Sequence, residues 1–114
     1  MTPIAARALS LASLALSAPV GAAVDGFAIV NQTGGALSEL ALRRVGDRTW
    51  QPLATTAAAG ASARADFKHD DCAFDLRATV AGAGQVTWSG VNLCDVKSVT
   101  LNRDSFGRHW VDYD

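Results

Sequence analysis

Two cysteines, Cys72 and Cys94, flank a segment in which apolar and polar side chains alternate. Side chains of a β-strand point to opposite faces with a period of two. One face of the first run is apolar throughout and consists of Cys72, Phe74, Leu76, Ala78 and Val80. After the Gly-Ala-Gly of residues 82–84, Val86 and Trp88 have the spacing of an antiparallel return strand. The pattern therefore predicts a β-hairpin over residues 72–94.

A three-residue loop that ends in glycine is a common hairpin closure, and residues 82–84 fit it. With that loop, the predicted cross-strand pairs are Val80 with Val86, Ala78 with Trp88, Leu76 with Gly90, Phe74 with Asn92 and Cys72 with Cys94. Opposed residues have Cα atoms about 4.5 to 5.5 Å apart, within the range of about 4.4 to 6.8 Å that a disulfide accepts. We therefore expect a disulfide between Cys72 and Cys94 that stabilises the fold by about 3 kcal/mol.

The N-terminal residues 1–23 have the pattern of a secretory signal peptide. Arg7 supplies a positive charge, residues 8–20 are apolar and small, and residues 21–23 offer small side chains for cleavage. The apolar stretch is shorter than the roughly 20 residues of a membrane-spanning helix, although an uncleaved anchor is the alternative. We expect export through the general secretory route to the periplasm or the medium, where disulfides form. No membrane association is expected after cleavage.

The remaining residues 24–114 predict a single all-β domain. Alternating apolar residues predict strands over residues 26–31, 37–43, 63–67, 72–80, 86–94, 96–101 and 109–113, and residues 26–43 read as a first hairpin. Residues 47–56 lack a period and read as a loop whose Trp50 and Leu53 pack against the sheet. About six or seven short strands favour a small antiparallel β-sandwich with immunoglobulin-like layers over a small barrel.

Composition excludes one class of function. The chain has 10 basic and 11 acidic residues and its arginines are interleaved with aspartates, so it lacks the basic surface of a nucleic-acid-binding protein.

Several blocks of the sequence resemble a group of small exported bacterial proteins of unknown function. The blocks are the Phe-Ala-Ile-Val-Asn-Gln-Thr-Gly of residues 27–34, the segment 37–40, Trp50 with Leu53, Gly60, Phe67, the Cys-Ala-Phe-Asp-Leu-Arg of residues 72–77, Trp88 and the Asn-Leu-Cys of residues 92–94. The chain departs from the group at residues 81–84, where Ala-Gly-Ala-Gly replaces a more acidic turn. The resemblance implies the fold and export, and it implies no catalytic residues.

Few residues are candidates for catalysis or metal binding. Oxygen and nitrogen ligands cluster near one turn, at Asp66, His69, Asp70, Asp71 and Asp75, but their spacing matches no EF-hand or zinc motif. We expect a solvated acidic turn there, with no metal and no cofactor. His69 and His109 are the only candidate bases for a nucleophile. Both fall in segments that read as exposed, so we expect a protein that is not an enzyme.

Aromatic residues are the better candidates for binding. Trp50, Trp110 and Tyr113 lie outside the strongest strand patterns and could stack on a sugar or anchor a protein, or could instead cover the open ends of the sandwich. Trp88 is expected in the core.

Smaller roles are predicted for other polar residues. Asp75 and Arg77 are expected to form a surface pair. Turn-capping roles are expected for Asn31, Asn92 and Asn102.

Two functions remain open at this point. One is a structural or interaction module of the cell envelope with an envelope protein as partner. The other is a small-ligand binder, for a carbohydrate at the exposed tryptophans or for a metal ion at the turn of residues 66–75.

Overall fold

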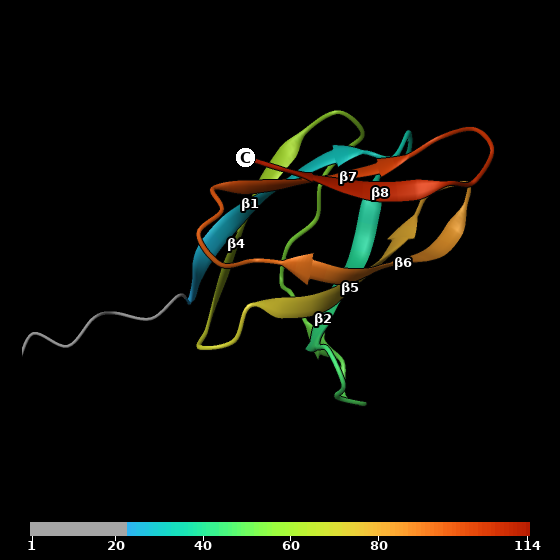
Figure 1. Cartoon of the computed structure of the whole chain (residues 1–114). Helices are drawn as coiled ribbons and strands as arrows, with labels where there is room; N and C mark the ends of the chain where they lie inside the picture. Colours follow the sequence, from blue (N-terminus) through green and yellow to red (C-terminus); the bar gives the residue numbers. More distant parts are fainter. Residues whose placement is uncertain (1–22) are drawn as a thin grey trace, which may run out of the picture.

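The computed structural model describes residues 23–114, so the predicted signal segment lies outside the described residues except for Ala23. These residues form eight strands and no helix. In chain order the strands are β1 (Val24–Gln32), β2 (Leu37–Arg44), β3 (Gln51–Pro52), β4 (Ser62–His69), β5 (Ala73–Val80), β6 (Gly84–Asn92), β7 (Ser98–Arg103) and β8 (His109–Tyr113). Figure 1 shows them as two layers.

The two layers are four-stranded sheets, and together they form the predicted β-sandwich. The first sheet has the order β4-β1-β7-β8 and the second the order β3-β2-β5-β6. Every pairing among the described strands is antiparallel except that of β1 with β7. The structure has one strand more than the seven predicted. The additional strand is the two-residue β3, which lies within residues 47–56, predicted as a loop, and pairs with β2. Leu53 follows it and packs against the core as expected.

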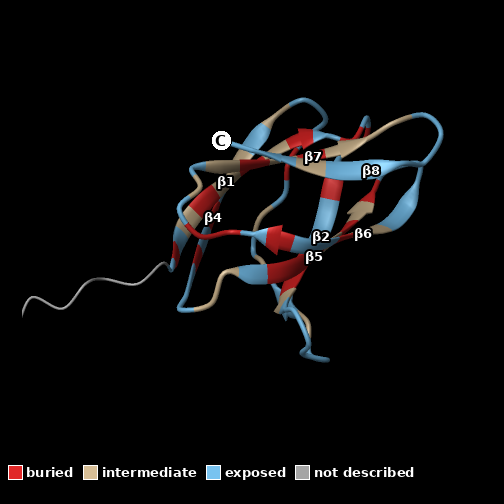
Figure 2. Ribbon diagram, in the orientation of Figure 1, coloured by how far each residue is buried: buried red, intermediate tan, exposed pale blue. Residues whose placement is uncertain are grey.

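The core fills the space between the facing sides of the two sheets, as the buried segments in Figure 2 show. The first sheet contributes Phe27 and Ile29 from β1 and Leu101 from β7, all fully buried. From the second sheet, Leu76 is fully buried and Trp88 is 2% exposed, so the prediction that Trp88 belongs to the core is confirmed. Alternating apolar residues thus bury one face of each sheet. Within the described residues no helix is long and apolar enough to cross a membrane.

The predicted first hairpin is wrong. β1 pairs with β4 and β7, whereas β2 pairs with β3 and β5, so residues 33–36 carry the chain from one sheet to the other. A Cβ on Gly35 would lie 2.4 Å from the backbone oxygen of Ala81, so only glycine fits this close crossing. The hairpin prediction is wrong because a sheet-to-sheet crossing and a hairpin turn use the same residue types.

The crossing is held by Asn31, which is fully buried at the end of β1. Its side-chain amide donates to the backbone oxygens of Gly35, Ala57 and Ala58 at 2.8, 3.1 and 3.1 Å. Its side-chain oxygen accepts from the backbone amide and the hydroxyl of Thr33 at 3.0 and 2.6 Å. The predicted turn-capping role of this asparagine is therefore correct, and it joins two loops that are distant in the sequence.

The predicted register of the cysteine hairpin is wrong by two residues near its turn. The loop consists of residues 81–83, so that Val80 pairs with Gly84, Ala78 with Val86 and Leu76 with Trp88. Between the turn and Leu76, a shift of two leaves every side chain on its predicted face, which is why the alternating pattern did not distinguish the two registers. Farther from the turn the prediction is wrong about the face as well, because Val91 is buried opposite Phe74 and Asn92 is exposed.

A β-bulge then brings the cysteines together. Asp75 lies opposite both Ser89 and Gly90, after which Phe74 pairs with Val91. The Asp75 carboxylate accepts the Gly90 backbone N–H at 3.0 Å, and Gly90 has a φ of 65°, a conformation that favours glycine. The bulge adds one residue to β6 and so recovers part of the offset from the predicted pairing.

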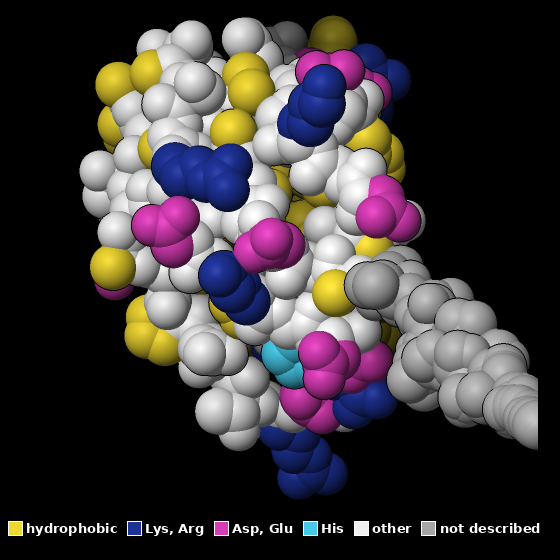
Figure 3. Space-filling model, turned by 90° about the vertical axis from the view of Figure 1, so that its left-hand side faces the viewer, with side chains coloured by type: hydrophobic (Ala, Val, Ile, Leu, Met, Phe, Trp, Pro, Cys, Tyr) yellow, Lys and Arg dark blue, Asp and Glu magenta, His cyan; other side chains and the backbone are white. Residues whose placement is uncertain are grey.

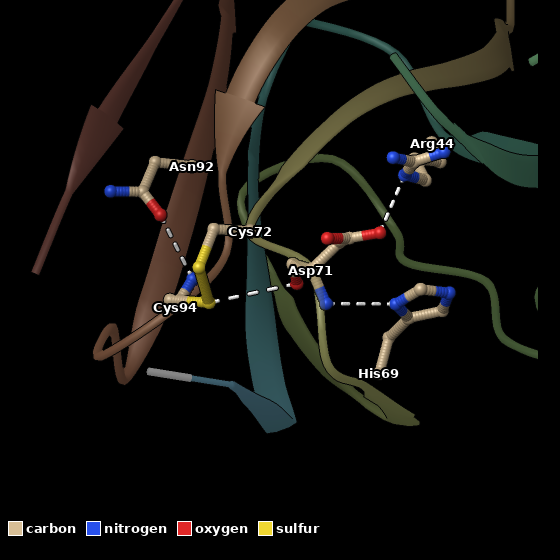
Figure 4. Close-up of a disulfide and its surroundings, with 6 residues drawn as sticks. All are labelled: Arg44, His69, Asp71, Cys72, Asn92 and Cys94. Carbon is tan, nitrogen blue, oxygen red and sulfur yellow. Dashed lines mark hydrogen bonds and ion pairs between the residues drawn. A yellow bond between two sulfur atoms is a disulfide. The ribbon is translucent and has the colours of Figure 1, made fainter. Parts of the chain in front are cut away.

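The predicted disulfide between Cys72 and Cys94 is confirmed, with a Cα–Cα distance of 5.0 Å. It lies just beyond the paired ends of β5 and β6, where the backbone N–H of Leu93 donates to the oxygen of Cys72. Asn92 caps this end, because its side-chain oxygen accepts the N–H of Cys94 at 3.0 Å (Figure 4). A disulfide of this kind indicates a non-cytoplasmic environment.

We expect the Asn31→Ala variant to lose about 2 to 4 kcal/mol of unfolding free energy, because several buried backbone carbonyls would lose their donor. Asn102→Ala is the matched control. Its amide serves only Thr100 and the exposed Asp112, so a loss below about 1 kcal/mol is expected. Chemical denaturation of the oxidised proteins measures both, and equal losses would contradict the proposed role of Asn31.

Candidate binding surface

The β7–β8 hairpin carries most of the exposed large hydrophobic side chains of the described residues. Phe106 in its turn is 82% exposed, and Trp110 and Tyr113 on β8 are 46% and 49% exposed. The other large hydrophobic residue in this class is Val45, at 46%. We call Phe106, Trp110 and Tyr113 the hairpin surface. β8 is an edge strand of the first sheet, so this surface lies at an open sheet edge (Figure 1).

Asp104 orders the turn that presents Phe106. One of its carboxylate oxygens accepts the backbone N–H groups of Phe106 and Arg108 at 2.9 and 3.0 Å, and the other accepts Arg108 Nε at 2.7 Å. The Arg108 guanidinium also lies over the Phe106 ring, 5.4 Å from its centroid. Desolvation acts to raise the pKa of Asp104, but the hydrogen bonds from Arg108 and Phe106 outweigh it and lower the pKa below its ordinary value. The turn is therefore ordered before any partner binds.

The two sides of β8 face different surroundings. Val111 lies opposite the buried Leu101 in the ladder and packs partly against the core, so His109 and Tyr113 share its face, toward β6. The Tyr113 hydroxyl accepts the backbone N–H of Asn92 at 3.1 Å. Trp110 alternates to the outer face of the first sheet, opposite Asn102.

A small cavity lies between the edge strands β6 and β8. Its volume is about 270 Å³, and its lining includes Thr87, Trp88, Ser89, His109 and Tyr113. The His109 ring meets Trp88 edge-on with centroids 5.9 Å apart, and Trp88 Nε1 donates to the backbone oxygen of Asn102 at 3.2 Å. The cavity therefore combines aromatic walls with polar groups.

Trp50 lies apart from the other two candidate residues. The guanidinium carbons of Arg43 and Arg77 lie 4.4 and 4.2 Å from its ring centroid, on the outer face of the second sheet. Trp50 is partly buried, and the two arginines occupy space above its ring. The structure therefore brings Trp110 and Tyr113 onto one hairpin but does not place Trp50 beside them as a second stacking platform.

The acidic segment of residues 66–75 is divided among separate ion pairs. Asp71 pairs with Arg44, as Figure 4 shows. Asp75 pairs with Arg43 at 3.0 Å. Figure 3 shows basic and acidic side chains interspersed over one face of the molecule. Within residues 23–114 no three His, Cys, Asp or Glu side chains form a group that could hold a metal ion.

The predicted surface pair of Asp75 and Arg77 is wrong. Asp75 is only 7% exposed and contacts Arg43 and the Gly90 backbone instead, because the bulge brings the Gly90 N–H toward it. Arg77 lies over Trp50, and its Nε is buried with no hydrogen-bond partner.

Both histidines lie at the surface, as predicted from their segments. His69 is exposed, and its Nδ1 accepts the backbone N–H of Asp71 at 2.9 Å (Figure 4). His109 is exposed, and its Nδ1 lies 3.4 Å from the Gly107 oxygen. No carboxylate is paired with either ring within the described residues.

Sequence reasoning missed Phe106. Residues 104–107, Asp-Ser-Phe-Gly, have the composition of a turn, and a surface turn gives no structural reason for an aromatic side chain at its tip. An aromatic residue inside an otherwise polar turn is therefore the feature of the sequence that could have identified Phe106 as a candidate binding residue.

Comparisons with known proteins support the fold alone. No family model and no curated protein matches the sequence. Among solved structures, the chain is similar to the NMR structure of a protein from Eubacterium rectale, with a TM-score of 0.56 and 18% sequence identity over 78% of this chain and 86% of that one. At this identity the likeness extends to the sandwich and not to a function.

We expect Asp104→Ala to loosen the β7–β8 turn without unfolding the domain, because the amides of Phe106 and Arg108 lose their acceptor. Amide hydrogen exchange at these two residues should accelerate. Asp112→Ala, which removes only a contact with Asn102, is the matched control and should leave the turn unchanged.

Protonation should mimic the Asp104→Ala change. Because the folded pKa of Asp104 is lowered, its contribution is present above the ordinary carboxyl pKa and is lost as the pH falls through the lowered value. NMR titration of the Phe106 and Arg108 amides measures this. Amide shifts centred above the ordinary carboxyl pKa would contradict the ordering role.

Proposed function

We propose that this protein is a non-enzymatic, exported interaction module of the cell envelope that contacts another protein through the hairpin surface. The observation that carries the proposal is the concentration of Phe106, Trp110 and Tyr113 on one edge hairpin. Exposed aromatic side chains of this kind supply most of the binding energy in many protein interfaces.

Preorganisation of the hairpin supports this role. The turn is fixed by Asp104, and Tyr113 is tied to β6 through its hydroxyl. Aromatic groups held in place before binding lose little conformational entropy on contact, which favours affinity. A hairpin with no binding role would gain nothing from keeping Phe106 exposed in an ordered turn.

Export to the periplasm or the medium through the general secretory route is the location we propose. Its support is the signal pattern of residues 1–23 together with the Cys72–Cys94 disulfide. Outside the cytoplasm the partner would be an envelope protein or a secreted one.

A carbohydrate is the second candidate ligand, and the cavity between β6 and β8 favours it. Tyr113 and His109 provide ring surfaces there, and Thr87 and Ser89 provide hydroxyl groups. The volume of the cavity is sufficient for about one sugar ring and lies near the lower end of the range of volumes found for ligand-binding sites. Saturable changes in the His109 and Tyr113 NMR signals on adding monosaccharides would support this candidate.

Photocrosslinking tests the protein-binding proposal. The photoreactive residue benzoylphenylalanine would replace Phe106 or Trp110, with Val45 as the control position, because Val45 is as exposed as Trp110 and lies outside the hairpin. In an envelope fraction of the source cells, adducts are expected from positions 106 and 110 and not from position 45. Excess wild-type protein should suppress them, and excess of a Phe106→Ser, Trp110→Ser double variant should not.

Absence of any protein adduct from positions 106 and 110 would refute the proposed function. Adducts of equal intensity from position 45 would also refute it, because they would reflect exposure alone.

A further inference from the structure

The directions of the backbone N–H and C=O groups of β8 identify which side of this strand is unpaired. Arg108 and Asp114, at its two ends, direct their backbone groups toward β7, where the Arg108 oxygen accepts from Asp104 and the Asp114 N–H donates to Ser98. Alternation along a strand then directs the N–H and C=O groups of residues 109, 111 and 113 away from β7. No described strand pairs with that side of β8.

This edge is self-complementary. If a second β8 runs antiparallel with Val111 on a two-fold axis, His109 lies opposite Tyr113 of the other copy, and all three outward-facing residues meet an outward-facing residue. The same register places Arg108 opposite Asp114 of the other copy, twice by symmetry. Like charges directly opposite each other would oppose the pairing, and this register places none in that position.

We propose that the partner of the β8 edge is a second copy of this chain, paired through β8 in an antiparallel register centred on Val111. This inference rests on the proposed function, since it names a partner for the β8 part of the hairpin surface. The two first sheets then join into one continuous sheet across an isologous interface.

The side chains of this register account for the exposed aromatics of β8. Trp110 lies opposite Asp112 of the other copy and diagonal to Trp110 of that copy. Diagonal neighbours are close enough for two aromatic side chains to make contact. The exposed ring of Tyr113 meets His109 of the other copy. Phe106 lies beyond the paired segment and stays free for a different partner.

A second copy fits this edge better than an unrelated extended peptide, because its charges match. An arbitrary strand would satisfy the backbone groups but would leave Asp114 without an opposite charge, whereas Arg108 keeps its pair with Asp104 of the same copy. The strand has only five residues, so we expect a small interface of the transient class, below about 1,200 Å². The Arg108–Asp114 pairs are exposed, so added salt should weaken the dimer.

Sedimentation equilibrium of the oxidised chain lacking residues 1–23 tests the dimer, from micromolar to millimolar concentration. The average mass should rise toward that of two chains in low salt and fall back in high salt. In Val111→Pro the association should be lost, because proline removes an N–H that faces the open edge and forms no ladder bond within one copy.

Charge variants keep the test independent of folding. Asp114→Arg should reduce association by placing two cations opposite each other. Asp114→Glu should keep it, because this variant preserves the charge and leaves Arg108, which also binds Asp104, untouched. Asp66→Arg is the matched control, because Asp66 is also an exposed acid and lies on β4, the opposite edge strand of the same sheet, so this variant should leave association unchanged. Circular dichroism checks that each variant folds.

A wild-type mass that stays monomeric up to millimolar concentration would overturn the inference. Full association of Asp114→Arg would overturn it too. If the chain is monomeric but position 106 still cross-links to another envelope protein, the dimer is refuted and the proposed function stands. If position 110 cross-links only to a second copy and the dimer forms, both are supported.

Discussion

The Cys72–Cys94 disulfide is the constraint on which the second sheet depends. It closes the open end of the β5–β6 hairpin, whose other end is closed by the turn at residues 81–83. Between these two fixed ends the strands differ in length, and the bulge at Gly90 takes up the difference. Asp75 stabilises that bulge and also binds Arg43 of β2. The bulge and the β2–β5 pairing are thus joined through one buried carboxylate.

Sequence patterns predicted much of this fold and missed specific parts for physical reasons. Alternation identified the strands, the buried Trp88 and the disulfide, because burial of one face imposes a period of two. The same period cannot distinguish registers that differ by two, which led to the wrong pairing of Ala78. The crossing after Asn31 read as a hairpin because turn residues report local backbone geometry and not which sheet the chain enters next.

The candidate surface was predicted in part. Trp110 and Tyr113 were identified because aromatic residues on a weak edge strand are not needed by a core, and both are exposed. Trp50 resembled them in sequence, yet two arginines from neighbouring strands lie over its ring, a contact that depends on tertiary pairing. Phe106 was missed because turn patterns give no weight to the residue at the tip. For Trp50, exposure thus depends on contacts between segments that are distant in the sequence.

A thiol count on the exported protein tests most directly the claim that the domain is held by an oxidised cysteine pair outside the cytoplasm. Protein recovered from the periplasm or the medium would be denatured without reductant, treated with a maleimide and analysed by intact mass. We predict a chain that begins after residue 23 and carries no maleimide adduct. Two adducts on that chain, or recovery of the protein only from the cytoplasm with residues 1–23 attached, would contradict it.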